Sequence, residues 1–473
     1  MRWNYLAGIA RALALGFALG SSSPMSWAQP SKPSHPSPKL IRYDEDWSAL
    51  RDPKLRSEWL DSLKYIPLAH CDECFLTIGG EIRQRYESFR NPTWGLDPMD
   101  NSGYLLQRYM LHADLHIGKR FRVFGQLKSG VENGRTGGAR PPDEDRLDVH
   151  QAFAEGRFWS PRDGQRLTLR AGRQEVNLGS SRLVSVREGP NVRLSFDGAR
   201  LSLEHSHWLV ELLALRPAET NAGIFDDSPN HKLSFWGAYA NRRLRRLAGG
   251  VDLYYLGLAR RSHAFDQANA REQRHSVGMR LYGEPSNWDY DYETVWQFGS
   301  FAPGKIRAWT VASNTGYTLR RLPLQPRLGL KLDAASGDKN PADTTLGTFN
   351  ALFPKGAYFS QADLLGPYNV IDLHPSLNLS LTRALSISTD ADYFWRQSTH
   401  DGIYDIPGNL LVSGKAGGAR YIGSHANIAA AWQANRQLRF EAQFLHFFPG
   451  QFLKEQGLDR PVNFLGVWAS FKF

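Results

Sequence analysis

The last twelve residues, Val462–Phe473, read VNFLGVWASFKF and alternate two kinds of side chain. The odd-numbered positions from 465 to 473 are all apolar, whereas the even-numbered ones include Gly466, Ser470 and Lys472. A period of two residues is typical of a β-strand. An apolar strand left at a sheet edge invites aggregation, and pairing with the first strand removes that edge. The segment therefore predicts the closing strand of a membrane β-barrel.

The first 28 residues have the pattern of a secretory signal. Arg2 and Arg11 lie before the apolar run Leu13–Leu19. Ser26-Trp27-Ala28 places small residues three and one positions before the expected cut. The alternative is a retained membrane anchor, for which the apolar run is too short. We expect cleavage after Ala28.

Composition favours one barrel domain over several soluble ones. The chain has 473 residues, of which 41% are hydrophobic and 12% aromatic, with a mean hydropathy of −0.45. After the signal no apolar run is long enough for a transmembrane helix. A polar average with many aromatics suits a barrel whose outer face is apolar and whose inner face is polar. No Pro/Ser-rich linker follows Lys39, so we expect a periplasmic extension at 29–74 and one barrel at 75–473. The apolar spacing over Asp44–Leu63 predicts a short helix in the extension.

The predicted strands and their connections indicate an all-β antiparallel barrel of about 18 strands. Eighteen alternating segments run from Phe75–Phe89 to Val462–Phe473. Odd-numbered connections such as 261–273, 337–369 and 398–419 are long, and even-numbered ones such as 118–120 are short; 302–305 is an exception. Outer-membrane barrels have long extracellular loops and short periplasmic turns. This pattern places both termini in the periplasm of a Gram-negative cell.

Alternation also assigns charged side chains to the barrel interior. An Arg or Lys on the lipid face costs about 2–4 kcal/mol at the midplane, so the charged face must point inward. A barrel of this size is too wide for its own side chains to fill, which predicts an aqueous lumen. The alternative is that the charges mainly pair across strands and stiffen the wall. The predicted pore-lining residues from alternation are Glu81, Arg83, Arg85, Arg108, Arg280, Lys331, Asp392 and Arg396.

A second group of basic residues is concentrated around the fifth and sixth predicted strands. Arg170, Arg173 and Arg193 belong to this segment, and the connection 179–191 joins the two strands. This connection either folds into the lumen or forms a solvated outer loop, and the sequence favours neither. The formal net charge of +10 is spread along the chain and not clustered in a run. That distribution favours a lumen that attracts anions over a surface that binds nucleic acid.

The two cysteines, Cys71 and Cys74, form a CxxC pattern just before the first predicted strand. In an exported protein a local structural disulfide is the favoured interpretation, with free thiols as the alternative. A zinc site needs about four ligands, and a redox motif needs a βαβ context, so neither is expected.

Several motifs resemble the alginate-export family of outer-membrane porins, over about Phe75–Phe473. They are GGEIRQRYE (79–87), GRQE (172–175), GPNVRLSFDGARL (189–201), SGD (336–338), FNALFPKGAYF (349–359), YFWRQS (393–398) and FFPG (447–450). The resemblance implies an eighteen-stranded barrel with an electropositive pore that passes an anionic polysaccharide outward. It also implies pore roles for Arg83, Arg85, Arg170, Arg173 and Arg396.

The long connection 337–369 is a candidate plug or gate, because its aromatics would otherwise face water. The alternative is an outer loop that packs on itself. The gate candidates are Phe349, Phe353, Lys355, Tyr358 and Phe359.

The leading functional prediction is a channel without a cofactor, for an anionic polysaccharide or small organic anions. Its expected partners are outer-membrane lipid, the anionic substrate and possible periplasmic export machinery, with no nucleic acid. The alternatives are a plugged structural or adhesin-like barrel and an outer-membrane lipid hydrolase. The hydrolase is disfavoured because the sequence has neither a GxSxG nor an HExxH motif.

Overall fold

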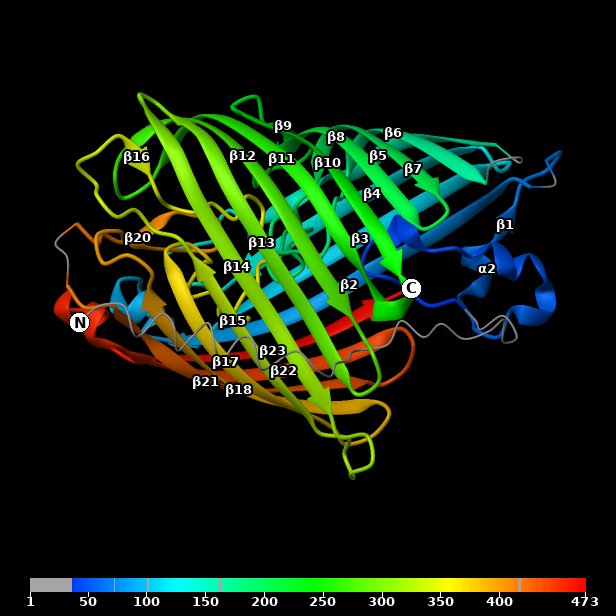
Figure 1. Ribbon diagram of the computed structural model, residues 1–473. Coiled ribbons are helices and arrows are strands. Elements are labelled where there is room, and N and C mark those ends of the chain that lie inside the picture. Colours follow the sequence, from blue (N-terminus) through cyan, green and yellow to red (C-terminus); the bar gives the residue numbers. More distant parts are fainter. Residues whose placement is uncertain (1–35, 72, 100–101, 161–163, 416–417) are drawn as a thin grey trace.

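A closed antiparallel barrel of eighteen strands dominates the computed structural model (Figure 1), as the sequence predicts. The structure describes residues 36–71, 73–99, 102–160, 164–415 and 418–473. The predicted signal and its cleavage point therefore lie outside the described residues. The last strand closes the barrel on the first, with Glu81 facing Lys472 and Arg90 facing Asn463.

Eighteen long strands form the wall, and a few short elements decorate it. The barrel strands are β2 (Phe75–Arg90), β3 (Tyr104–Ile117), β4 (Phe121–Asn133), β5 (Asp145–Ser160), β6 (Gln165–Gln174), β7 (Phe196–His205), β8 (Trp208–Glu219), β10 (Leu233–Leu244), β11 (Gly249–Ala264), β12 (Asn269–Gly283), β13 (Trp288–Phe301), β14 (Gly304–Thr318), β15 (Arg327–Ala335), β17 (Val370–Ser380), β18 (Leu385–Arg396), β21 (Tyr421–Gln433), β22 (Leu438–Pro449) and β23 (Val462–Lys472). The short strands are β1 (Ile66–Pro67), β9 (Ser228–Pro229), β16 (Thr345–Leu346), β19 (Ile403–Tyr404) and β20 (Leu410–Val412). The helical turns are η1 (Arg42–Asp44), η2 (Ser48–Arg51), η3 (Pro53–Leu55), α2 (Asp61–Lys64), η4 (Pro92–Gly95), η5 (Arg245–Leu247) and α3 (Gln451–Glu455).

Side chains alternate between the two faces of the wall, as their polarity requires. In β3, Leu111 is 52% exposed on the outside, whereas its neighbours Arg108 and His112 are buried on the inside. In β13, Trp296 is exposed and Gln297 is buried in the same way. The apolar outer face is thus available to lipid, and the polar inner face is covered from within the barrel.

The two ends of the barrel differ in their connections, and we call them the short-turn end and the long-loop end. Turns such as 118–120, 206–207 and 434–437 lie at the first end, and the connections 336–369 and 397–420 lie at the second. The predicted long connection at 261–273 is wrong, because β11 and β12 continue the strand pairing and leave only 265–268 between them. The short connection at 302–303 is the exception that the sequence predicts.

The segment before the barrel enters the short-turn end (Figure 1) and does not form the helix that apolar spacing over Asp44–Leu63 suggests. It is broken into η1, η2, η3 and α2, and Pro53 opens a new turn in the middle. A proline cannot continue a preceding helix without losing a hydrogen bond, so the spacing is overridden. Tyr43 packs edge-on against Phe124 and Phe153 of the inner wall.

Among the residues that the structure describes, no helix is long and apolar enough to cross a membrane.

Candidate pore and constriction

Two connections from the long-loop end, 175–195 and 336–369, fold into the barrel, and we call them the inward loops. They pair through their backbones: Phe353 N donates to Leu183 O at 2.8 Å, and Ser185 N donates to Phe353 O at 3.0 Å. Their tips touch so closely that a Cβ on Gly356 would lie 2.4 Å from Cδ of Pro190. Glycine is therefore needed at this crossing. The two loops form one unit inside the wall.

The aromatic side chains of the second inward loop are buried against that wall. Phe353 lies 5.1 Å from the ring of Phe196 and 5.3 Å from that of Phe235. Phe359 packs edge-on against Phe394 at 5.1 Å. Phe349 is 2% exposed. These contacts bury the apolar surface of a loop that would otherwise face water. The structure thus places the predicted gate aromatics inside the barrel; that they gate transport stays a prediction.

Three predicted pore arginines of β2 and β3 hold the tip of the first inward loop. Arg83 donates to Glu188 O at 2.9 Å and Pro190 O at 2.8 Å. Arg85 donates to Gly189 O at 3.0 Å, and Arg108 donates to Asn191 O at 2.8 Å. An irregular loop has carbonyls without partners in a sheet, and buried carbonyls must be satisfied. The arginines therefore act as donors that fix the tip of the loop against β2 and β3.

The other predicted pore-lining residues are largely engaged in ion pairs. The basic residues have carboxylate partners: Glu155 for Arg170 (2.9 Å), Asp197 for Arg173 (2.9 Å), Glu175 for Arg193 (2.8 Å), Asp291 for Arg280 (2.8 Å) and Asp333 for Lys331 (3.7 Å). The acidic residues have basic partners, Arg108 for Glu81 (3.0 Å) and His374 for Asp392 (2.9 Å). Such pairing is what the sequence offers as the alternative to substrate contact. Whether any of these residues touches a substrate stays a prediction.

Arg396 lies in the packed outer loops and not on an open surface. It is fully buried, and it donates to Thr399 O at 2.9 Å and Ala419 O at 2.7 Å. Its guanidinium lies 3.8 Å from the ring centre of Phe452 in α3. The residue therefore fastens the connection 397–420 to the end of β18.

Three cations near the inward loops remain without a carboxylate. Within the described part of the chain, no Asp or Glu oxygen lies within 4.0 Å of the charged nitrogens of Arg83, Arg187 or Lys355. Burial lowers the pKa of Lys355 to about 8, and the nearby charge of Lys331 adds to this effect. Burial also lowers the pKa of Arg187. Positive charge that forms no ion pair inside a wall favours anions over cations.

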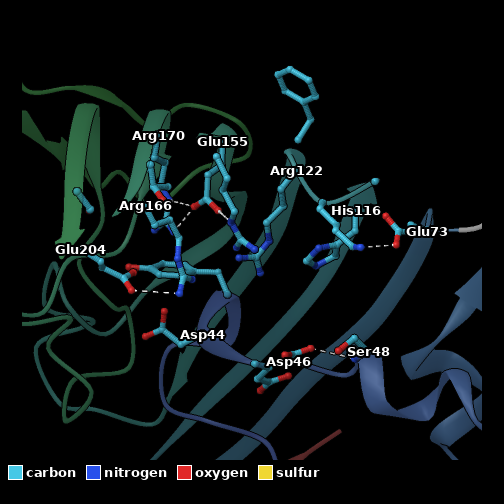
Figure 2. Close-up of a pocket in the computed structure, with 18 of the residues that line it drawn as sticks. Asp44, Asp46, Ser48, Glu73, His116, Arg122, Glu155, Arg166, Arg170 and Glu204 are labelled. Atoms are coloured by element: carbon cyan, nitrogen blue, oxygen red, sulfur yellow. Dashed lines mark hydrogen bonds and ion pairs between the residues drawn. The ribbon is translucent and has the colours of Figure 1, made fainter. Parts of the chain in front are cut away.

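A vestibule of about 800 Å³ opens between the N-terminal segment and the inner wall at the short-turn end (Figure 2). Arg122, Glu155 and Arg170 point into it from the wall, and Asp44 and Asp46 come from the N-terminal segment. Basic and acidic side chains are equal in number along its lining: Arg51, Lys119, Arg122, Arg157, Arg166, Arg170 and Arg200 against Asp44, Glu45, Asp46, Glu73, Glu155, Glu204 and Glu211. The vestibule is therefore charge-balanced and does not by itself make the lumen electropositive.

Sequence reasoning missed the role of the N-terminal segment in this site. The guanidinium of Arg170, predicted to line the pore, lies 3.9 Å from the ring centre of Tyr43. Tyr43 donates to Glu175 O of the first inward loop at 2.7 Å, and Arg42 donates to Gly80 O at 3.1 Å. Arg42 and Tyr43 lie just before the apolar spacing over 44–63, so no periodic pattern marks these two residues as part of the site.

Cys71 and Cys74 form a disulfide, with their Cα atoms 5.2 Å apart. It closes the turn between β1 and β2 at the short-turn end, ahead of the first barrel strand. It lies away from the inward loops, so it stabilises the segment at the short-turn end and does not contribute to the narrowing of the lumen by these loops.

Comparison with known proteins gives a family and a fold. The sequence profile of the family described as alginate export matches residues 75–466. No curated protein matches the chain. Its structure is similar to that of OccK8 (OprE) of Pseudomonas aeruginosa, with 11% identity, a TM-score of 0.55, and 84% and 98% of the two chains covered.

Two further structures from Pseudomonas aeruginosa give the same picture. OccD3 (OpdP) has 12% identity and a TM-score of 0.54, with 84% of this chain and 91% of that chain covered. OccK2 (OpdF) in complex with glucuronate has 14% identity and a TM-score of 0.53, with 85% and 98% covered. At such low identity these likenesses establish the fold alone.

Proposed function

Because the chain belongs to the alginate export family and forms an outer-membrane β-barrel porin, we propose that it conducts anionic sugars of the uronate type or small organic anions. Family and fold together point to a channel and not to an enzyme. The observation that carries the choice of anions is the set of three cations, Arg83, Arg187 and Lys355, that form no ion pair with a carboxylate among the described residues. The glucuronate complex of OccK2 supports this class, because glucuronate is a sugar carboxylate.

The orientation follows from the connections and is part of the same proposal. Outer-membrane barrels expose long loops to the outside and short turns to the periplasm. The long-loop end is then extracellular, and both termini, with the extension 29–74 left after cleavage at Ala28, are periplasmic. Any periplasmic export machinery would meet the short-turn end. Passage of a polymer outward is the more specific interpretation, and it requires the inward loops to move.

Single-channel recording tests the proposal. The purified barrel, placed in a planar bilayer under a KCl gradient, should give a reversal potential that indicates a preference for chloride, and added glucuronate should reduce the current. Arg83→Gln should lower the anion preference, because it removes a cation that forms no ion pair with a carboxylate. Arg383→Gln is the matched control, since it removes the same charge from an exposed turn between β17 and β18. Cation selectivity in the unmodified protein would refute the proposed substrate class.

The packed inward loops favour a second candidate, a barrel whose lumen is blocked. The buried contacts of Phe353 and Phe359 with the wall are the specific observation for it. A blocked barrel should show no conductance, and it should begin to conduct only when residues 345–363 are deleted. A channel should conduct without that deletion.

A further inference from the structure

One row of side chains on the inner wall has the composition of a metal site. Asp392 of β18 directly faces His425 of β21, and His374 of β17 lies on the other side of Asp392 in the same cross-strand row. One ligand atom from each of the three lies within 4.8 Å of the others. Asp392 and His425 are buried, and the side chain of His374 is 13% exposed. Strand register alone thus brings two imidazoles and a carboxylate together.

The hydrogen bonds around the row orient the ring of His374. Its Nε2 lies 3.0 Å from Oδ1 of Asp390, whose other oxygen accepts from Asn427 at 2.7 Å. A carboxylate at one imidazole nitrogen keeps the proton there and leaves a lone pair on the other. That other atom, Nδ1, lies 2.9 Å from Oδ2 of Asp392. A lone pair and a carboxylate oxygen repel each other at this distance, so either a second proton on the ring or a metal ion lies between the two atoms.

The atoms that face the centre of the row share a second property. Nδ1 of His374, both carboxylate oxygens of Asp392 and Nε2 of His425 have no hydrogen-bond partner among the described residues. A buried polar group without a partner costs roughly 1–3 kcal/mol, and more when it is charged. Lys331 on the adjacent strand is turned to the inward loop, where its Nζ lies 3.4 Å from Tyr358 O. Nδ1 of His374 and Oδ2 of Asp392 are 2.9 Å apart, and Nε2 of His425 lies 3.4 Å from Oδ1 of Asp390, so these atoms lie close together without forming a well-aligned hydrogen bond.

We propose that His374, Asp392 and His425 bind a divalent transition metal of the zinc class. Imidazole nitrogens and a carboxylate are ligands for Zn²⁺ and its neighbours, whereas Mg²⁺ and Ca²⁺ prefer oxygen alone. In a tetrahedral site with ligand atoms at about 2.0–2.2 Å from Zn²⁺ these atoms lie roughly 3.3–3.6 Å apart, so the 2.9 Å between Nδ1 of His374 and Oδ2 of Asp392 has to widen by a few tenths of an ångström when the metal binds. Three protein ligands leave a fourth position for water. Asp390 acts as the positioning residue that orients His374.

The metal would join β17, β18 and β21 where the wall supports an inward loop. The ring of Phe394 in β18 lies 5.5 Å from that of His425 and 5.1 Å from that of Phe359. Binding at the row therefore stiffens the part of the wall on which the second inward loop rests. The inference does not depend on which solute the barrel conducts.

Metal titration of the purified full-length barrel tests this site. After treatment with a chelator and its removal, ZnCl₂ should bind with saturation at one equivalent in calorimetry. CoCl₂ should give a visible absorption spectrum that ZnCl₂ displaces. His374→Gln, His425→Gln and Asp392→Asn should each abolish saturable binding, and Asp390→Asn should weaken it by roughly 10- to 100-fold, the usual effect of losing a carboxylate behind a histidine ligand.

The matched control is His446→Gln, which alters a histidine of β22 that contacts Asn463 and no member of the row. It should bind Zn²⁺ as the unmodified protein does, and circular dichroism should show the same strand content in every variant. A contrasting arrangement is a doubly protonated His374 that bridges Asp390 and Asp392 without metal. Absence of saturable Zn²⁺ and Co²⁺ binding in the unmodified protein, or binding that survives in folded Asp392→Asn, would overturn the proposal.

Discussion

At the scale of single residues, Lys355 and Asp363 give the pore a specific dependence on pH. Burial lowers the pKa of Lys355 to about 8 and raises the pKa of Asp363 to about 8. Below pH 8 the lysine is cationic and the aspartic acid is neutral; above pH 8 the lysine is neutral and the aspartate is anionic. The inward loop therefore becomes less positive by two unit charges as pH rises. Reversal potentials should show that chloride preference falls between pH 7 and 9.

Two variants separate these contributions. Lys355→Arg keeps its charge over this range, so only the Asp363 part of the change should remain; Asp363→Asn should leave only the Lys355 part. A chloride preference that is flat from pH 7 to 9 in the unmodified protein would contradict the assignment of both groups to the conducting path.

The inward direction of side chains could be predicted residue by residue, but their partners could not. Alternation places Arg83 and Arg108 inside because lipid excludes them. It cannot reveal that they bind carbonyls of residues 188–191, since those partners lie about a hundred positions away along the chain. The same limit applies to Arg170: its face was predictable, but the Tyr43 ring that covers it was not.

At the scale of elements, the N-terminal segment lies in the short-turn end of the barrel without taking part in the strand pairing that closes the wall. Its contacts with the barrel include Tyr43 against the rings of Phe124 and Phe153 and the Arg42 hydrogen bond to Gly80 O. Deleting residues 36–64 should widen the vestibule and raise single-channel conductance. The closed strand ladder between β2 and β23 does not include the deleted segment, so the barrel should still fold.

A smaller change tests the same segment without a deletion. Tyr43→Ala removes the buried ring and should make the segment more accessible to limited proteolysis, whereas Trp59→Ala removes a ring that is 77% exposed and should not. Unchanged conductance after the deletion would show that the vestibule does not limit flow.

Strands and connections differed in how well the sequence predicted them. Alternating strands are specified locally by polarity, so their number and order could be read directly. The inward course of 175–195 and 336–369 depends on the wall that receives them, and the sequence left the course of the connection 179–191 undecided for that reason. The prediction of a helix over 44–63 was wrong. The apolar spacing fits a helix, but Pro53 interrupts it and starts a separate turn.

At the scale of the whole molecule, the inward loops and the barrel diameter together set the size of solute that can pass. A wall of eighteen strands is too wide for its own side chains to close. The inward loops, held by Arg83 and by the Phe353 contacts, narrow that space.

Proteoliposomes should therefore take up glucuronate but exclude an oligouronate of several sugars. Deleting residues 345–363 should admit both solutes. Shortening the largely exposed turn 319–326 between β14 and β15 should change neither rate. If the unmodified protein passed the oligouronate as fast as glucuronate, the inward loops would have to swing aside during transport, and polymer export would become the better account of the same fold.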